Sequence, residues 1–229
     1  MKRSITVISV GGSLIAPDKI DVKFLHNFRR LIIKHLKHGH RFILICGGGG
    51  AARTYQNAAR KIGKPASADL DWLGIHGTRI NAHLLRTIFG AYAHKKIIKP
   101  DEQADFKEAI LVGGGWKPGW STDYCAVKLA ERYGAARLLN LSNISFVFDR
   151  DPRVYKSAKP QPELTWTQFR KMIPKKWSPG LSSPFDPVAS REAQKNRLEV
   201  AIINGEDFKS IDNYLKNRAF HGTVIKPAR

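Results

Sequence analysis

Three clusters of glycine are the part of this sequence best suited to chemistry. They are Gly11-Gly12 followed by Ser13, the four glycines at 47–50, and Gly113-Gly114-Gly115. Glycine lets a backbone approach phosphate oxygens closely, and a helix that begins at such a loop offers unpaired N–H groups. The clusters therefore predict a phosphate site. They form no Walker A loop, because no Gly-Lys-Ser/Thr follows, and no dinucleotide fingerprint, because the first loop lacks a third glycine.

Each glycine cluster follows a short apolar run typical of a buried strand. These runs cover residues 5–10, 41–46 and 109–112. Helical spacing of apolar residues begins after each of them. Strands that alternate with helices form a mainly parallel sheet, whose strands have their carboxyl ends at one edge. The three loops are therefore expected to lie close together at that edge.

The same alternation continues to the end of the chain. A long helix is expected from Asp71 to about residue 89. Further strands are expected at 136–141, 200–203 and 223–225. The fold class is therefore α/β, with three α/β/α layers around a mainly parallel sheet. Prolines and longer loops become frequent after Asn140, which favours an N-terminal lobe over residues 1–140 and a C-terminal lobe over 141–229, in one continuous domain.

The charge of the chain is strongly positive. The 39 Lys and Arg residues exceed the 19 Asp and Glu residues and give a formal net charge of +20. Such a chain attracts polyanions or phosphorylated metabolites. No helix-turn-helix, zinc finger or aromatic RNA-binding strand motif accompanies the charge, so nucleic-acid binding is not expected as the main function.

The sequence argues against a metal site, a membrane span and secretion. Cys46 and Cys125 lie in apolar segments, which suits a reducing compartment and leaves no thiolate metal site. His35 and His38 have the spacing of metal ligands without a carboxylate at ligand spacing, so a packed or solvated helix face is expected and no residue is assigned to a metal. The longest apolar run, residues 42–46, is far too short for a membrane span, and no signal peptide is recognised, so we expect a cytoplasmic protein without membrane contact.

Two longer motifs make the glycine pattern more specific. One reads Asp-x-x-Gly-Ile-x-x-Thr-Arg-x-Asn from Asp71 to Asn81, and the other reads Pro-Gly-x-x-Thr-Asp from Pro118 to Asp123. Together with the glycine loops they resemble the amino acid kinase superfamily, and within it the archaeal-type UMP kinases, over nearly the whole chain. The resemblance implies transfer of the γ-phosphoryl group of MgATP to the 5′-phosphate of UMP, which gives UDP. It also implies a homo-oligomer, of which a hexamer is one form.

The resemblance assigns roles to individual residues. Asp123, Arg53 and Lys117 are expected to be catalytic, because this chemistry needs orientation and charge neutralisation around the transferring group. The residues expected to bind ATP are Gly12, Ser13, Gly49, Arg53, Ser142, Asn143, Phe148 and Asp151. The residues expected to bind UMP are Gly48, Asp71, Gly115, Trp116, Lys117, Pro118, Gly119, Trp120, Ser121 and Thr122. Among these, Asp71 is expected to accept hydrogen bonds from the ribose.

The sequence departs from the superfamily pattern near the expected phosphates. Ser9 stands where much of the superfamily has a lysine, and Gly50 stands where Lys or Asn is common. Lys117 in the third loop is a candidate for the replacement charge. The segment 144–148 lacks the usual Asp-Gly pair of the nucleotide-binding strand.

Other interpretations remain open on these residues. A kinase of the same superfamily with another small acid or phosphate as acceptor fits the altered third loop. A catalytically weak nucleotide-binding protein, serving as a sensor or an RNA-associated factor, fits the missing lysine and the charge. Asp71 and Asp123 can each be an ordinary helix N-cap, and Asp151 before Pro152 can simply close a turn.

Overall fold

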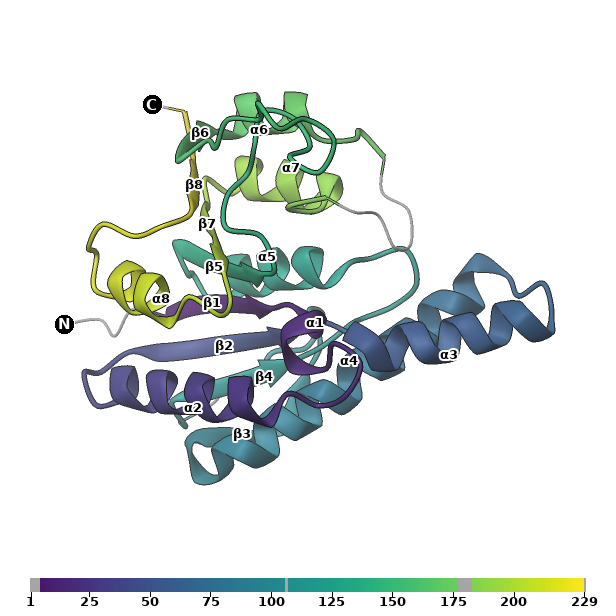
Figure 1. Ribbon diagram of the computed structural model, residues 1–229. Coiled ribbons are helices and arrows are strands. Elements are labelled where there is room, and N and C mark those ends of the chain that lie inside the picture. Colours follow the sequence, from purple (N-terminus) through teal and green to yellow (C-terminus); the bar gives the residue numbers. More distant parts are fainter. Residues whose placement is uncertain (1–4, 106, 177–182, 229) are drawn as a thin grey trace.

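The computed structural model describes residues 5–105, 107–176 and 183–228. An eight-stranded sheet runs through it in the order β3-β4-β2-β1-β5-β7-β8-β6 (Figure 1). The strands are β1 (Ile5–Val10), β2 (Arg41–Cys46), β3 (Ala93–Ile98), β4 (Ile110–Gly113), β5 (Arg137–Ser142), β6 (Glu163–Thr165), β7 (Glu199–Asn204) and β8 (Thr223–Lys226). Neighbouring strands from β3 to β7 are parallel, and β8 is antiparallel to β7. The predicted mainly parallel sheet is confirmed.

The two edge strands, β3 and β6, were missed by the sequence prediction. β3 carries the exposed Lys95 and Lys96 at its centre and so lacks the apolar pattern of an inner strand. Lysines on an edge strand discourage pairing with another chain. β6 has only three residues, too few for a periodic signal.

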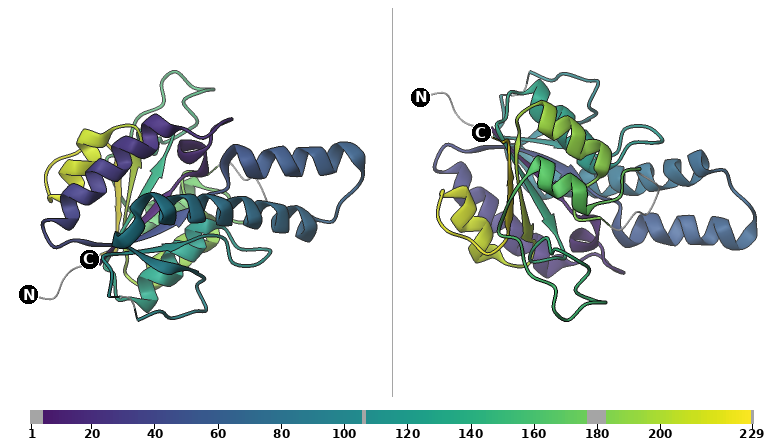
Figure 2. Two further views of the ribbon diagram at one scale, coloured as in Figure 1. Left: turned by 90° about the horizontal axis from the view of Figure 1, so that it is seen from below. Right: turned by 90° about the horizontal axis from the view of Figure 1, so that it is seen from above.

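Helices cover both faces of the sheet (Figure 2). The helices are α1 (Gly12–Ile15), α2 (Val22–Leu36), α3 (Gly49–Ile62), α4 (Ser67–Phe89), α5 (Thr122–Arg132), α6 (Trp166–Met172), α7 (Pro187–Lys195) and α8 (Phe208–Leu215), with a 3₁₀ turn at Gly90–Tyr92. Val7 of β1 packs in a core with α5, α6 and α7, whereas Ile8 packs in a second core with α2, α4 and α8. These two cores establish the three α/β/α layers. Within the described residues, no helix has the length and apolar character needed to cross a membrane.

α3 and the first half of α4 form an arm that projects from the body (Figures 1 and 2). The second half of α4 returns under the sheet, where Ala82, Leu85 and Phe89 are buried. The helix begins at Ser67 and not at Asp71 as predicted, because its first turns lie in the arm and show no apolar periodicity to read. α4 therefore runs without interruption from the arm into the core.

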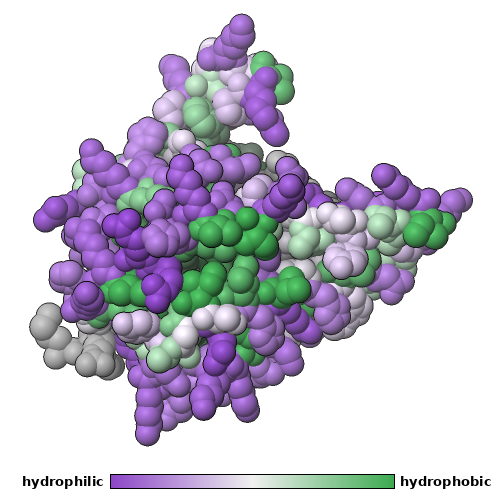
Figure 3. All heavy atoms as spheres, turned by 60° about the horizontal axis from the view of Figure 1, so that its bottom comes forward, coloured by the Kyte–Doolittle hydropathy of each residue, from purple (hydrophilic) through white to green (hydrophobic). Residues whose placement is uncertain are grey.

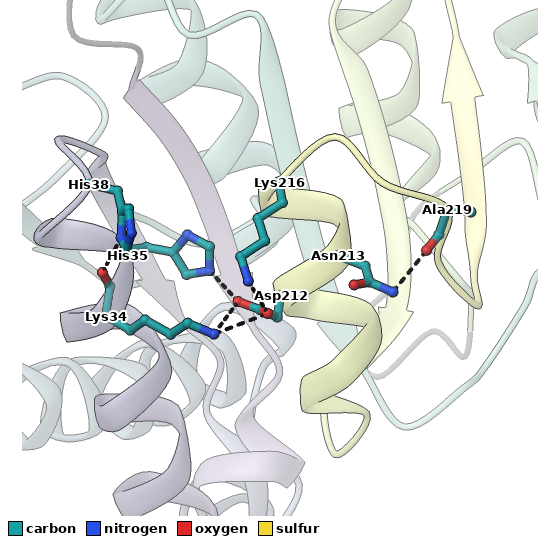
Figure 4. A network of polar contacts seen from close by, with 7 residues as sticks. All are labelled: Lys34, His35, His38, Asp212, Asn213, Lys216 and Ala219. Atoms are coloured by element: carbon teal, nitrogen blue, oxygen red, sulfur yellow. Dashed lines mark hydrogen bonds and ion pairs between the residues drawn. The ribbon is translucent and has the colours of Figure 1, made fainter.

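A buried histidine joins α8 to α2 (Figure 4). His35 is 2% exposed, and its Nε2 lies 2.8 Å from Oδ1 of Asp212, a carboxylate that also binds Lys34 and Lys216. Burial would raise the pKa of Asp212, but its three hydrogen-bond partners bring that pKa well below its ordinary value. His38 turns away, with Nδ1 2.9 Å from the carbonyl oxygen of Lys34. His35 is a packing residue between two helices.

Candidate functional site

The first and second glycine loops touch backbone to backbone. A Cβ added to Gly12 would lie 2.1 Å from the nitrogen of Gly49, and one added to Gly49 would lie 2.1 Å from the carbonyl oxygen of Gly12. Gly49 also has φ of +61°, a conformation that favours glycine. β1 and β2 are neighbours in the sheet, so their loops meet at its carboxyl edge. This part of the predicted juxtaposition is confirmed.

Gly50 is required by the chain that follows α1. Its N–H donates to the carbonyl oxygen of Ala16 at 2.6 Å, and a Cβ at this position would lie 2.3 Å from the carbonyl oxygen of Pro17. A lysine or asparagine would clash here unless this segment moved. The missing side-chain donor at position 50 therefore follows from how closely this segment covers the second loop.

Gly12→Ala is expected to lower the free energy of unfolding by about 3 kcal/mol, because the added methyl group overlaps backbone atoms that cannot move independently. Gly63→Ala is the matched control, since it has extended backbone and no atom within 4 Å of the added carbon. The control is expected to be neutral or slightly stabilising. Urea denaturation of both variants measures the difference, and equal stabilities would contradict the close contact.

The third glycine loop is held by side chains of α4. Its Gly115 N–H donates to Oγ1 of Thr78 at 2.6 Å, and its Gly119 N–H donates to Oδ2 of Asp71 at 2.8 Å. Asp71 therefore contacts the loop that the resemblance assigns to UMP. Because Asp71 lies inside α4, its alternative interpretation as an N-cap is wrong. Its proposed contact with the ribose stays a prediction.

Aromatic rings line the end of the third loop. Trp120 stacks on Tyr124 at 4.0 Å between ring centroids, and Trp116 lies 6.1 Å from Trp120. Lys117 is exposed, and its Nζ lies 4.0 Å from the centroid of the Trp116 ring. This cation–π contact holds the lysine charge at the loop.

Asp123 is the most perturbed acidic group of this edge. Ser9 Oγ donates to its Oδ1 at 3.3 Å, and the backbone N–H of Asp186 donates to its Oδ2 at 3.1 Å. Burial, and then the nearby charge of Asp186, raise the pKa of Asp123 to about 7. Within the described ranges, no Lys, Arg or His nitrogen lies within 4.0 Å of its carboxylate. A buried carboxylate without a cationic partner is destabilised in its ionised form, and a nearby cation would lower its pKa again.

The helix that carries Asp123 is capped by another residue. The Ser121 side chain accepts the N–H of Tyr124 and is the N-cap of α5. Asp123 lies in the first turn of the helix with its side chain on Ser9, so the N-cap interpretation of Asp123 is wrong. The predicted strand-to-loop-to-helix path of this motif is otherwise confirmed.

The residues expected on the ATP side are spread over three segments. Ser142 is the last residue of β5 and lies next to the first glycine loop. A Cβ added to Gly11 of that loop would lie 3.7 Å from the Cα of Ser142. Arg53 is exposed and donates to the carbonyl oxygen of Pro17 at 2.9 Å. Asp151 is farther along the chain and binds Arg153 at 2.8 Å, which lowers the pKa of Asp151.

After β5 the chain forms turns that involve Phe148 and Asp151. Phe148 forms a bridge with Pro160, and the Asp151 carboxylate accepts the backbone N–H of Arg153 at 2.9 Å. The turn-closing interpretation of Asp151 is therefore confirmed. Roles of Asn143, Phe148 and Asp151 toward ATP stay predictions.

The sequence identified Asp186 as the start of a helix but assigned it no role at this site. Asp186 is buried, and it caps α7 by accepting the N–H of Ala189 at 2.6 Å. The Asp-Pro pair at 186–187 is a recognisable helix start, but nothing in it indicates a contact with Asp123. Only the tertiary fold brings the backbone N–H of Asp186 onto the carboxylate of Asp123, and the charge of Asp186 near it.

Comparisons with known proteins identify the family of this sequence and fold. The model described as "Amino acid kinase family" matches residues 4–204. The uridylate kinase of Hyperthermus butylicus is 32% identical, over 92% of this chain and 93% of its own length, and that of Methanocorpusculum labreanum is 33% identical, over 96% and 94%. The crystal structure of the uridylate kinase from Archaeoglobus fulgidus matches with a TM-score of 0.80 and 28% identity, over 96% of this chain and 99% of that one.

Proposed function

This chain belongs to the amino acid kinase family, in its archaeal-type uridylate kinase branch, and from that premise we propose that it transfers the γ-phosphoryl group of ATP to UMP. The observation that carries the proposal is the meeting of glycine loops at one sheet edge beside Asp123. We assign UMP and the phosphates to the N-terminal lobe, residues 1–140, and the ATP base and ribose to residues 141–229. The reaction needs positioning and charge neutralisation more than covalent chemistry by the protein.

Backbone N–H groups and helix N-termini are the proposed phosphate ligands. The first and second loops, with Gly12, Ser13 and Gly49, hold the ATP phosphates, while the third loop holds the phosphate of UMP. Lys117 in that loop supplies a positive charge. The guanidinium of Arg53 binds a phosphate after it has exchanged its hydrogen bond to the carbonyl oxygen of Pro17 for one to the phosphate. Asp123 orients the cationic groups around the transferring phosphoryl group.

Mg²⁺ is the proposed companion of ATP. This ion is usually bound by substrate phosphates and by one or two carboxylates, with water at its other positions. Asp123 is the carboxylate that would hold such an ion, and Oδ2 of the nearby Asp186, which is buried without a hydrogen-bond partner, is the second candidate. Among the described residues no cluster of three or more His, Cys, Asp or Glu suited to a metal occurs. When bound, Mg²⁺ would neutralise charge on the phosphates.

We propose assembly as a homo-oligomer through the face that carries α2 and α4. Figure 3 shows apolar side chains gathered in the middle of this face. Val22 of α2 and Ile80 of α4 are 71% and 64% exposed, and Leu84 and Ile88 continue the same side of α4. An exposed apolar patch of this kind is typical of an interface between proteins. The free, buried Cys46 and Cys125 suit a reducing compartment, and the cytoplasm is the proposed location.

The test is ADP release by the purified protein with MgATP and UMP, CMP, AMP, GMP or no acceptor in parallel. The expected result is turnover selective for UMP. Turnover with another acceptor only would assign the chain a different substrate within the family. ATP binding without turnover by any acceptor would overturn the kinase proposal and favour a nucleotide sensor.

A further inference from the structure

The Thr-Arg-x-Asn part of the motif on α4 faces two glycine loops at once. Nδ2 of Asn81, which is 1% exposed, donates to the carbonyl oxygens of Gly47 and Gly48 at 2.8 and 3.2 Å. One turn earlier, Oγ1 of Thr78 accepts the N–H of Gly115 in the third loop. A single turn of α4 therefore fixes the second and third loops relative to each other.

Arg79 lies between Thr78 and Asn81 in the sequence, and its guanidinium binds backbone carbonyl groups of the third loop. Its Nη2 donates to the carbonyl oxygen of Trp116 at 3.0 Å, and its Nε lies at 3.4 Å from that of Gly115. The other side of the guanidinium faces the ring of Trp72 at 6.0 Å. A planar guanidinium presents its donors in a fixed geometry, which suits it to neighbouring carbonyl groups.

The direction of these carbonyl groups matters for an anionic ligand. A carbonyl oxygen carries partial negative charge and would repel a phosphate that approached it. With the oxygens of Gly115 and Trp116 held on Arg79, the loop keeps them on the side of α4. Asp71 holds the far end of the same loop by the N–H of Gly119, so both ends are tied to one helix.

We propose that Arg79 is the positioning residue of the acceptor loop, and that Thr78, Arg79 and Asn81 together set the spacing between the donor and acceptor loops. Arg79 acts through the loop and does not itself touch the reacting atoms. The inference rests on the proposed function for its kinetic consequence only. The ordering of the loop by Arg79 is a property of the protein without ligand.

Hydrogen–deuterium exchange of the ligand-free protein tests the ordering. In Arg79→Gln the amides between 113 and 122 are expected to exchange about tenfold faster, because hydrogen bonds to a charged group are lost. Arg79→Lys, which keeps the charge but not the fork, is expected to lie between wild type and Arg79→Gln. Arg60→Gln is the control, an exposed arginine on the arm whose hydrogen-bond partner among the described residues is Asn57. Exchange in Arg79→Gln equal to that of the control would overturn the inference.

Steady-state kinetics tests the consequence. Arg79→Gln is expected to raise the KM for UMP about tenfold and to leave the KM for ATP nearly unchanged, with partial recovery in Arg79→Lys. Equal increases in both KM values would overturn the specific role in the acceptor loop. If wild type shows no UMP turnover, the proposed function fails, and the exchange experiment alone decides whether Arg79 orders the loop.

Discussion

Asp123→Asn is expected to abolish phosphoryl transfer and, at the same time, to stabilise the ligand-free protein at pH 8. Activity should fall at least about 100-fold, because the neutral amide cannot orient cationic groups around the transferring phosphoryl group. The shape of the side chain is kept: the amide oxygen can accept the backbone N–H of Asp186, and the hydroxyl of Ser9 can rotate to accept from the amide nitrogen. Loss of activity and gain of stability in one variant would separate a functional carboxylate from a structural one.

The gain of stability depends on pH in a defined direction. The pKa of Asp123 rises from its ordinary 3.8 to about 7 in the folded chain, so the folded state binds the proton more tightly than the unfolded state. Ionisation therefore costs the fold stability progressively as pH rises from about 4 to 7, and this cost is complete above pH 7. Asp123→Asn removes the cost, which we expect to be about 2 kcal/mol at pH 8 after allowance for screening by solvent.

Thermal unfolding of wild type and Asp123→Asn between pH 4 and pH 8 makes the measurement. The two curves should coincide near pH 4 and separate as pH rises. Glu163→Gln, which removes an exposed carboxylate of the edge strand β6, should leave activity unchanged and alter the free energy of unfolding by no more than about 0.5 kcal/mol. A wild type that is more stable than Asp123→Asn at pH 8 would show that the carboxylate is stabilised by a charge that the described contacts lack.

Ser9→Lys is expected to raise kcat about tenfold. Ser9 is 3% exposed and points at Oδ1 of Asp123, so a lysine would extend its ammonium group toward that carboxylate. The new charge would neutralise the transferring phosphoryl group, and a tenfold gain corresponds to about 1.4 kcal/mol. It would also lower the pKa of Asp123 and shift the pH dependence of kcat to lower pH.

Ser9→Met is the control of similar length without charge. A higher kcat in Ser9→Lys together with a lower kcat in Ser9→Met would show that the ammonium group causes the increase. Lys117→Met, made both in wild type and in the Ser9→Lys variant, asks whether Lys117 supplies the charge in wild type. Lys117→Met should lower kcat more in the wild-type background than in the Ser9→Lys background. Equal decreases in kcat would show that Lys117 does not supply this charge.

The inner strands were predictable because they are buried on both sides. Ile5–Val10 and Arg41–Cys46 have the predicted bounds, since continuous apolar runs that end in glycine leave little choice. The meeting of their two loops followed from the parallel sheet alone. β3 escaped because its exposed lysines reflect an edge position, which is a property of the neighbours and not of the strand itself.

The chemistry of the site was predictable in part. Ser9 could be recognised as a missing lysine, but its hydrogen bond to Asp123, 114 residues away, depends on the packing of α5 against β1. Asp186 could be recognised as a helix cap, whereas its effect on the pKa of Asp123 needs the path of the chain after β5. Residue types and spacing identified the loops, and tertiary packing decided which side chains meet there.

The place of β1 in the middle of the sheet has a consequence for synthesis of the chain. β1 pairs with β2 at once, but its other partner, β5, begins only at Arg137. As the chain leaves the ribosome, β3, β4, β2 and β1 can form a four-stranded sheet whose outer strand is the apolar β1. That strand exposes unpaired N–H and C=O groups until β5 arrives, and such an edge readily pairs with another chain. A nascent chain stalled between β4 and β5 is therefore the form of this protein most in need of a chaperone.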